Sequence, residues 1–354
     1  MPVIQTLPGA WLQKTGDGRT AWNLSDDIVA AVAGAKGKRR VVLRAAVKAG
    51  CVVLREDAAA TTRADTSDAR RTIDEVAEAC RSALPSDTAR DAAIASAASA
   101  AKDVDWDVCR LAVNCQAVDL AALCDHFDGL DDEDEVRRSH VGASVVARAC
   151  GSSDVEALQR LYLKLRFNAF PVDGGLALFE RASALNHACA PNASLSFSRD
   201  GRHLSVVLGC DLKEGDEVRI SYLSPRALAA PASARRAALE AGFLFRCACA
   251  RCTSKEEVDV AVVDAAAEAL TNSVVDDRLA HALSALSEDP LGASTPLLRA
   301  DLRLLAAKAL AKRDTAAAAL LADDALRDLR MSLDADDPRV STAAVFVAEL
   351  ERRR

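Results

Sequence analysis

The cysteine-rich stretch at residues 247–252 reads CACARC, and it places the thiols of Cys247, Cys249 and Cys252 within six residues. A zinc ion prefers four tetrahedral ligands, so this stretch supplies three of them and needs a fourth from elsewhere in the chain. The alternative is three unrelated buried thiols. Cysteines at turn-scale spacing in an intracellular chain usually indicate metal binding, so the stretch predicts a zinc site that is shared with another segment.

The composition favours a soluble, globular chain of two or three packed units. The 354 residues are 50% hydrophobic and carry a formal net charge of -7, with a pI near 5.4. This acidic balance argues against direct nucleic-acid binding. We find neither a secretory signal nor an apolar run long enough for a membrane span. We therefore expect an intracellular location, cytoplasmic or nuclear, where the eleven cysteines are buried thiols or metal ligands rather than disulfides.

Two further segments combine polar residues with strand-like sequence. Residues 186–192 read NHACAPN, and residues 215–222 read GDEVRISY, a turn that leads into a strand ending at Tyr222. Taken alone, the first segment is a polar loop with a hydrogen-bonded histidine, and the second is an ordinary hairpin. Neither indicates catalysis by itself, and the informative feature is their order along the chain with the cysteine stretch.

Runs of β-branched and apolar residues predict strands in two separate parts of the chain. The expected strands are residues 41–43, 52–54, 194–197, 203–208 and 217–222. Residues 1–35 are ambiguous, and residues 23–33 are compatible with a short helix after a glycine-rich turn.

Helical spacing of apolar residues covers the middle and the end of the chain. Residues 153–170 are expected to form an amphipathic helix with Ser152 or Ser153 as its N-cap. Residues 66–150 have a helical texture, interrupted by an acidic run at 128–135 that we expect to be a solvated loop. Near the end of the chain, the expected helices are residues 297–311, 316–333 and 340–350.

The order of NHACAPN, GDEVRISY and FRCACARC resembles the SET-domain lysine methyltransferases, and most of all their subgroup with an inserted MYND zinc finger. The stretch VKAGCVVL at 47–54 and the helix end NAF at 168–170 are similar to further segments of that family. The resemblance is continuous over residues 155–252. It implies an α+β fold with a β-rich SET core, a helical insert, a zinc-bound post-SET segment and an all-α, helical-repeat-like C-terminal region.

The resemblance also implies a division into domains. The expected parts are an N-terminal segment at 1–35, a SET core split between 36–60 and 151–223, a helical insert at 61–150, a post-SET zinc segment at 224–252 and a helical C-terminal domain at 253–354.

The function implied by the resemblance is the transfer of a methyl group from S-adenosyl-L-methionine to a lysine ε-amine of a protein substrate, histone or non-histone. Tyr222 matches the catalytic tyrosine beside the transferred methyl, and Phe243 takes the place of a second tyrosine that often lines the lysine channel. The cofactor contacts implied by the family are Asn168, Ser183, Asn186, His187, Tyr222 and Phe245. The implied ligands of one structural Zn²⁺ are Cys189, Cys247, Cys249 and Cys252, so Cys189 supplies the fourth ligand.

Several departures from the family pattern favour an alternative function. The glycine-rich cofactor turn reads KGKRR at 36–40, with a single glycine, and Ala188 replaces a serine. A MYND finger is not recognisable. Cys115, Cys124 and His126 could form a separate metal group, but their helical spacing favours buried thiols. The alternative is a catalytically weak or inactive SET-fold protein that binds partners through its helical C-terminal region.

Overall fold

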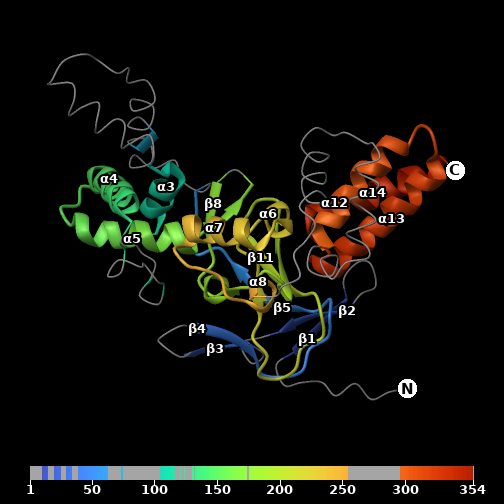
Figure 1. The fold of residues 1–354 in the computed structure, drawn as a ribbon, viewed down its shortest axis with the longest axis horizontal. Coiled ribbons are helices and arrows are strands. Elements are labelled where there is room, and N and C mark those ends of the chain that lie inside the picture. The colour runs from blue at the N-terminus through green and yellow to red at the C-terminus, as the bar shows by residue number, and fades with distance from the viewer. Residues whose placement is uncertain are drawn as a thin grey trace, which may run out of the picture. The chain divides into compact units, whose positions relative to one another are not determined.

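The computed structural model describes residues 10–14, 20–24, 29–33, 39–62, 73–74, 104–115, 120, 123, 130, 132–173, 175–253 and 296–353. It divides into two compact units (Figure 1). The first unit contains Met1–Arg55, Ala184–Arg199 and Leu204–Arg354, and the second contains Glu56–Ser183 and Asp200–His203. The domain boundaries expected from the sequence stay predictions.

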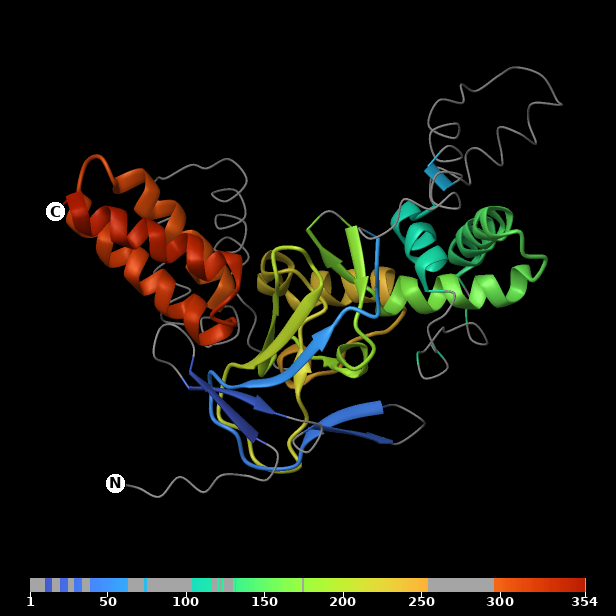
Figure 2. The ribbon, with the colours of Figure 1, turned by 180° about the vertical axis from the view of Figure 1, so that it is seen from behind.

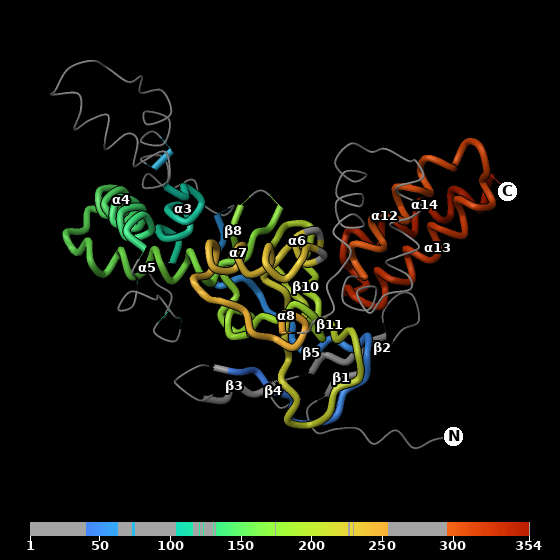
Figure 3. Tube along the Cα trace, in the orientation of Figure 1, coloured from blue at the N-terminus to red at the C-terminus, as the bar shows by residue number. Residues whose placement is uncertain are grey.

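Three helices form the core of the second unit (Figure 3). They are α3 (Trp106–Asn114), α4 (Glu133–Cys150) and α5 (Val155–Asn168). The helix expected at 153–170 is confirmed as α5, but its N-cap is Asp154, whose carboxylate accepts a hydrogen bond from the backbone N–H of Ala157. A carboxylate at this position accepts a hydrogen bond from a backbone N–H that would otherwise be unpaired. Its negative charge also interacts favourably with the positive end of the helix dipole.

The acidic run at 128–135 is only partly the loop that the sequence predicts. Asp132 caps α4, and Glu135 lies in the first turn of that helix with 3% of its surface exposed. Arg138 donates a hydrogen bond of 2.8 Å to the Glu135 carboxylate. Negative charges are stabilising at the start of a helix, so a cluster of acidic residues can begin a helix as well as form a solvated loop.

A small sheet completes the second unit. Its antiparallel strands are ordered β6 (Ala60–Thr61), β8 (Gly175–Leu178) and β7 (Phe170–Val172). Gly175 has a φ of +149°, and a Cβ atom at this position would overlap Oγ1 of Thr62. The strand therefore requires glycine at its first residue.

The strands that lie wholly or mostly in the first unit form several small sheets (Figures 1 and 2). They are β1 (Ala10–Lys14), β2 (Thr20–Leu24), β3 (Val29–Ala33), β4 (Arg39–Leu43), β5 (Val52–Asp57), β9 (Asn186–His187), β10 (Ala193–Phe197), β11 (His203–Leu208) and β12 (Arg219–Ile220). β1 pairs with β2 and β3 with β4, both antiparallel. β10, β11 and β5 form a three-stranded sheet, and β9 pairs with β12 in parallel.

Most of the strands expected from the sequence are confirmed. β4, β5, β10 and β11 cover the expected segments, whereas the segment 217–222 forms a strand only at Arg219–Ile220. The short helix considered for 23–33 is wrong, because residues 23–24 end β2 and residues 29–33 form β3. Val29 of β3 lies opposite Leu43 of β4, and such a partner strand decides the conformation of a short apolar run.

Between the strands and the C-terminal helices, short helices carry the cysteine stretch. They are α6 (Pro225–Ala229), α7 (Ala232–Phe243) and α8 (Ala250–Thr253). The helices expected near the end of the chain are confirmed as α12 (Pro296–Leu310), α13 (Thr315–Ser332) and α14 (Pro338–Arg353). Alanine and leucine side chains make up most of their shared core. None of the helices in the described part of the chain is long and apolar enough to cross a membrane.

Buried polar side chains join the turn between α13 and α14 to the sheet within the first unit. Ser196 of β10 donates a hydrogen bond of 2.8 Å to Asp337 and accepts one of 3.1 Å from the backbone N–H of Asp334. Arg55 of β5 forms an ion pair of 2.9 Å with Asp334. Buried polar groups that satisfy one another in this way fix a single docking geometry.

Several sequence predictions lie outside the described residues. They are the helical texture over most of 66–103, the first three residues of the stretch KGKRR, the side chains of Cys124 and His126, and the beginning of the C-terminal region at 254–295. Cys115 is described, and it is buried as expected.

Candidate functional site

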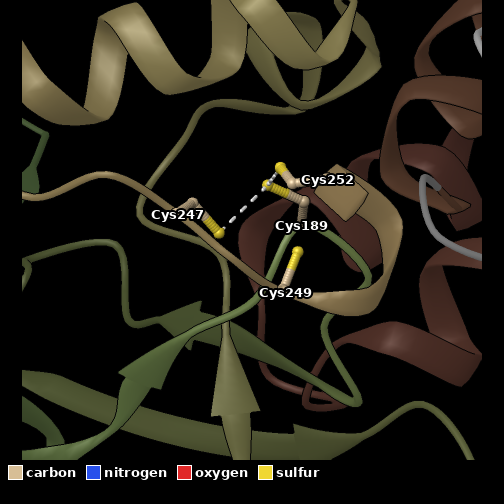
Figure 4. A group of neighbouring side chains, drawn as sticks. All are labelled: Cys189, Cys247, Cys249 and Cys252. Carbon is tan, nitrogen blue, oxygen red and sulfur yellow. Dashed lines mark hydrogen bonds between the residues drawn. The ribbon is translucent and has the colours of Figure 1, made fainter. Parts of the chain in front are cut away.

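Four cysteines from two distant segments of the first unit meet at one point. Cys189 lies in the loop after β9, and Cys247, Cys249 and Cys252 lie in the segment that leads into and through α8. Figure 4 shows their side chains pointing toward one another. All four Sγ atoms lie within 4.8 Å of one another, and the Sγ of Cys189 is 3.4 Å from that of Cys252 and 4.0 Å from that of Cys247.

The cluster has the dimensions of a tetrahedral metal site. Zinc–sulfur bonds of about 2.3 Å place the sulfurs of a tetrahedron roughly 3.8 Å apart, close to the separations found here. The four cysteines are the one group of three or more potential ligands that the described residues bring together in this way. The expected ligand set, including the fourth ligand Cys189, is therefore brought together.

Two arginines lie beside the cysteine cluster, Arg235 buried and Arg251 half-buried. Arg235 of α7 is 2% exposed, and its Nη2 is 3.6 Å from the Sγ of Cys252. Arg251 donates a hydrogen bond of 2.6 Å to the carbonyl oxygen of Cys189. The Nε of Arg235 and the Nη2 of Arg251 have no hydrogen-bond partner among the described residues.

Buried positive charges need nearby negative charge. A dication held by four thiolates carries a net charge of -2, which two guanidinium groups balance. Four neutral thiols would leave the buried Arg235 and the half-buried Arg251 without nearby negative charge. The arginines therefore fit a site in which the sulfurs are ionised and bound to zinc.

The protonation of the thiols also depends on their surroundings. Burial raises the pKa of Cys189 above its ordinary value and raises that of Cys247 to about 11. At Cys249, hydrogen bonds from the backbone and from neighbouring thiols outweigh the effect of burial, and they lower the pKa to about 7. The metal-free cluster therefore resists full ionisation, whereas a coordinated dication deprotonates its thiol ligands.

A third arginine fixes the backbone of the cysteine segment. Arg236 of α7 donates hydrogen bonds to the carbonyl oxygens of Cys247, at 3.1 Å, and Cys252, at 2.7 Å. These bonds hold the two ends of the CACARC stretch against α7.

Tyr222 lies directly beside the cysteine cluster. It follows β12, which pairs in parallel with β9 so that Ile220 lies opposite His187. The backbone N–H of Tyr222 donates to Nδ1 of His187 at 3.0 Å, and the Tyr222 hydroxyl donates to the carbonyl oxygen of Leu185 at 2.6 Å. Nε2 of His187 is 3.2 Å from the Sγ of Cys189, so the histidine contacts both the tyrosine and the cluster.

Aromatic rings surround the tyrosine. The ring centroid of Tyr222 is 4.9 Å from that of Phe243 and 6.3 Å from that of Phe245, and Phe245 also lies 6.1 Å from His187. The structure therefore brings together four of the expected site residues, which are His187, Tyr222, Phe243 and Phe245. Burial lowers the pKa of His187 to about 4, helped by the positive charge of Arg235.

A backbone feature that sequence reasoning missed places the two phenylalanines. Leu244 ends α7 with a φ of 56°, and its N–H donates to the carbonyl oxygen of Glu240. A left-handed conformation costs a non-glycine residue roughly 1–2 kcal/mol. This conformation turns the chain sharply, so that Phe243 and Phe245 both contact Tyr222. No sequence signal marks it, because such a position usually carries glycine.

Glu217 is a second residue without an expected role. Its carboxylate accepts hydrogen bonds from Asn186, at 2.8 Å, and from Arg219, at 2.9 and 2.7 Å. Its backbone carbonyl accepts a further bond from Asn192 at 2.8 Å. Both asparagines of NHACAPN are therefore held by the segment GDEVRISY, which explains why the two motifs belong together.

Asn168 and Ser183, the other expected cofactor contacts, lie in the second unit. The hydroxyl oxygen of Ser183 lies 2.9 Å from the carbonyl oxygen of Asn168 and 2.6 Å from that of Phe179, and these two acceptors compete for its single proton. The side chain of Asn168 donates to the carbonyl oxygen of Lys164 at 2.7 Å. The structure brings these two residues together with each other.

Comparison with known proteins identifies relatives of the chain. The SET domain profile matches residues 39–223, more than half of the 354 residues. A SET and MYND domain-containing protein of Dictyostelium discoideum is 31% identical over 112 residues, which are 28% of this chain and 21% of that protein. The human N-lysine methyltransferase SMYD2 is 28% identical over 141 residues, 37% of this chain and 31% of that protein.

The human histone-lysine N-methyltransferase SMYD3 is a further relative, 33% identical over 90 residues, which are 25% of this chain and 20% of that protein. The chain therefore matches between 20% and 31% of the length of these curated relatives.

Proposed function

Because this chain belongs to the SET domain family, we propose that it transfers a methyl group from S-adenosyl-L-methionine to a lysine ε-amine of a protein substrate. The observation that carries the proposal is the position of Tyr222. Its hydroxyl and its backbone N–H are both held by hydrogen bonds, and its ring lies against Phe243 and Phe245. The printed names of SMYD2 and SMYD3 as lysine methyltransferases support the reaction class.

For this reaction the protein mainly has to position the cofactor and the lysine amine and to exclude water from the site. S-adenosylmethionine supplies, when bound, a methyl group on a positively charged sulfur. The lone pair of the neutral lysine amine forms the new N–C bond in line with the C–S bond that breaks, and the electrons of that bond stay on sulfur. Holding reactants in this geometry supplies much of the rate enhancement of such a displacement.

The aromatic rings account for the protonation state of the substrate. A lysine in water has a pKa of about 10.4 and is protonated, so its nitrogen has no free lone pair. Apolar surroundings lower the pKa of an amine because they disfavour its charged form. The rings of Tyr222, Phe243 and Phe245 supply such surroundings. The hydroxyl proton of Tyr222 is donated to Leu185, and the hydroxyl oxygen can still accept a hydrogen bond from the amine and so orient it.

The proposed cofactor contacts are Asn186, His187, Tyr222 and Phe245, of which Asn186 is fixed by Glu217. Asn168 and Ser183 remain contacts that the family resemblance implies. We assign Phe245 to packing on the adenine and Tyr222 to the methyl group, as the family resemblance implies.

We further propose that Cys189, Cys247, Cys249 and Cys252 bind one structural Zn²⁺. The mutual distances of the four sulfurs and the positive charges of Arg235 and Arg251 beside them support this assignment. Structural zinc contributes on the order of 10 kcal/mol to the folding of small domains. Here it would join β9, which contains Asn186 and His187, to the segment that contains Phe245, and so hold two parts of the proposed cofactor site together.

The experiment that tests the proposed function combines binding with turnover. Isothermal titration calorimetry of the zinc-loaded full-length protein with S-adenosylmethionine measures cofactor binding. Incubation with methyl-labelled S-adenosylmethionine and a protein extract of the source organism measures transfer. We expect saturable binding and label on lysine residues of extract proteins. A folded, zinc-loaded protein that neither binds the cofactor nor transfers the label contradicts the proposal.

The alternative, a non-catalytic interaction protein, is supported by a different part of the structure. Leu320 and Met331 of α13 and Val345 of α14 are exposed apolar side chains, with Leu320 at 67%. Exposed apolar residues on a helical region favour partner binding when they form a contiguous patch. Absence of cofactor binding in the calorimetric experiment, together with partner capture that is lost in Leu320→Glu, would favour this function.

A further inference from the structure

We propose that His187 is a positioning residue that couples the zinc ligand Cys189 to Tyr222 through its two ring nitrogens. The inference rests on the proposed function, because it names how the metal and the proposed catalytic tyrosine depend on each other.

The backbone of Tyr222 decides which ring nitrogen carries the proton. A backbone N–H can only donate, and the N–H of Tyr222 lies 3.0 Å from Nδ1 of His187. Nδ1 is therefore the acceptor and carries no hydrogen. The proton of the imidazole is then on Nε2, which lies 3.2 Å from the Sγ of Cys189. The geometry assigns an N–H···S hydrogen bond from His187 to this sulfur.

The strand pairing holds the two residues in register. Ile220 of β12 lies opposite His187 of β9, and the backbone N–H of Ala188 donates to the carbonyl oxygen of Ile220 at 2.9 Å. The hydroxyl of Tyr222 reaches the carbonyl oxygen of Leu185, two residues before His187. Both polar ends of Tyr222 are therefore attached to the segment 185–187, and one of these attachments passes through the imidazole.

A zinc ion would affect the hydrogen bonds of His187 through the sulfur of Cys189. A thiolate bound to zinc is a negatively charged acceptor, and it favours the imidazole form whose proton is on Nε2. That same form leaves Nδ1 free to accept from Tyr222. Zinc therefore stabilises the hydrogen bond that holds the tyrosine backbone, and loss of the metal weakens it.

Two variants separate the two nitrogens. In His187→Asn, the side-chain oxygen replaces the Nδ1 acceptor, and the donor to the sulfur is lost. In His187→Gln, the longer side chain places an amide N–H where Nε2 was, and the acceptor for Tyr222 is lost. Both variants remove the ring, so the loss of packing against Phe245 is common to both and cancels in the comparison.

We expect His187→Asn to weaken zinc retention more than His187→Gln does, and His187→Gln to lower methyl transfer more than His187→Asn does. Zinc transfer to a chromogenic chelator should be roughly 10- to 100-fold faster from His187→Asn than from His187→Gln, because outer-shell partners of metal ligands typically contribute that much to affinity. The methyl-transfer kcat should be lower in His187→Gln than in His187→Asn. Equal chelator rates in the two variants overturn the proposal.

The wild-type protein provides a test that does not depend on either variant folding. Two-bond ¹⁵N–¹H correlation spectra of the zinc-loaded, histidine-labelled protein report which ring nitrogen carries the hydrogen. We expect the Nε2–H form for His187, and an Nδ1–H form overturns the proposal. The spectra and the chelator rates use no cofactor, so a failure of the proposed methyl transfer leaves them interpretable and remains distinguishable from a failure of this coupling.

Discussion

Replacement of Arg235 by methionine tests the charge of the cysteine cluster. Arg235 is 2% exposed, and its Nη2 lies 3.6 Å from the Sγ of Cys252. Methionine keeps much of the side-chain volume and removes the charge. The sign of the effect depends on whether the sulfurs are ionised, so the same variant gives different results with and without metal.

The expected magnitudes follow from the energetics of buried ions. With zinc bound, Arg235 balances the negative tetrathiolate, and breaking such a buried pair costs about 3–5 kcal/mol. Without zinc, the neighbouring thiols are largely neutral, and Arg235 with its unpaired Nε is an uncompensated buried cation. Arg235→Met should then be neutral or stabilising, because an apolar side chain of similar volume replaces an unbalanced charge.

The assay is equilibrium urea unfolding of zinc-loaded and chelator-treated protein. Arg246→Met is the matched control, since Arg246 adjoins Cys247 but has a side chain 73% exposed. Surface substitutions of this kind usually change stability by less than about 0.5 kcal/mol. If Arg235→Met stabilises the zinc-loaded protein, or changes both forms equally, the reasoning about the charge of the cluster is refuted.

Three further predictions concern the metal, the helical core and acid stability. Cys249→Ser should lower the zinc content by about one ion per chain, measured by atomic emission, and an unchanged content contradicts the four-ligand site. Gly142→Ala should lower the free energy of unfolding by about 1–3 kcal/mol, because the added Cβ would overlap the ring of Tyr162; an unchanged melting temperature argues against that contact. Burial acts to raise the pKa of Asp337, but its hydrogen bonds and ion pair with Arg339 lower that pKa by more. The ionised Asp337 therefore stabilises the fold at pH values above its unfolded pKa of about 3.9. This stability is lost as the pH falls through the lower pKa of the folded state. Asp337→Asn should remove this part of the acid dependence in unfolding curves measured at a series of pH values, and identical pH profiles would contradict the assignment.

The cysteine site shows what sequence reasoning could reach. The spacing in CACARC indicates a metal and a missing ligand, since three thiols do not complete a tetrahedron. Cys189 could be named because NHACAPN resembles a family motif that supplies the fourth ligand, and the structure brings it to the other three sulfurs. Motifs of this kind carry ligand chemistry in their own residues, so they can be found without coordinates.

The surroundings of the site could not be predicted in the same way. Arg235 lies on α7, a helix that the sequence analysis does not predict, and tertiary packing buries it against the sulfurs. The left-handed Leu244 breaks a local preference and carries no sequence signal. The acidic residues near Glu135 show that one sequence pattern can fit two structures, because a pattern typical of a solvated loop also suits the start of a helix. Charge partners and strained turns depend on long-range contacts, which local patterns do not contain.

The most direct test of the central claim compares the two tyrosines of the chain. Tyr222→Phe removes the hydroxyl that we assign to the methyl-transfer site, and Tyr162→Phe removes a buried hydroxyl that accepts a hydrogen bond from the backbone of Asp105. Single-turnover methyl transfer, with zinc-loaded protein and saturating cofactor, should fall roughly 100-fold in Tyr222→Phe, within the range expected for a positioned catalytic hydroxyl. Tyr162→Phe should keep the wild-type rate. Equal rates for wild type and Tyr222→Phe would contradict the account.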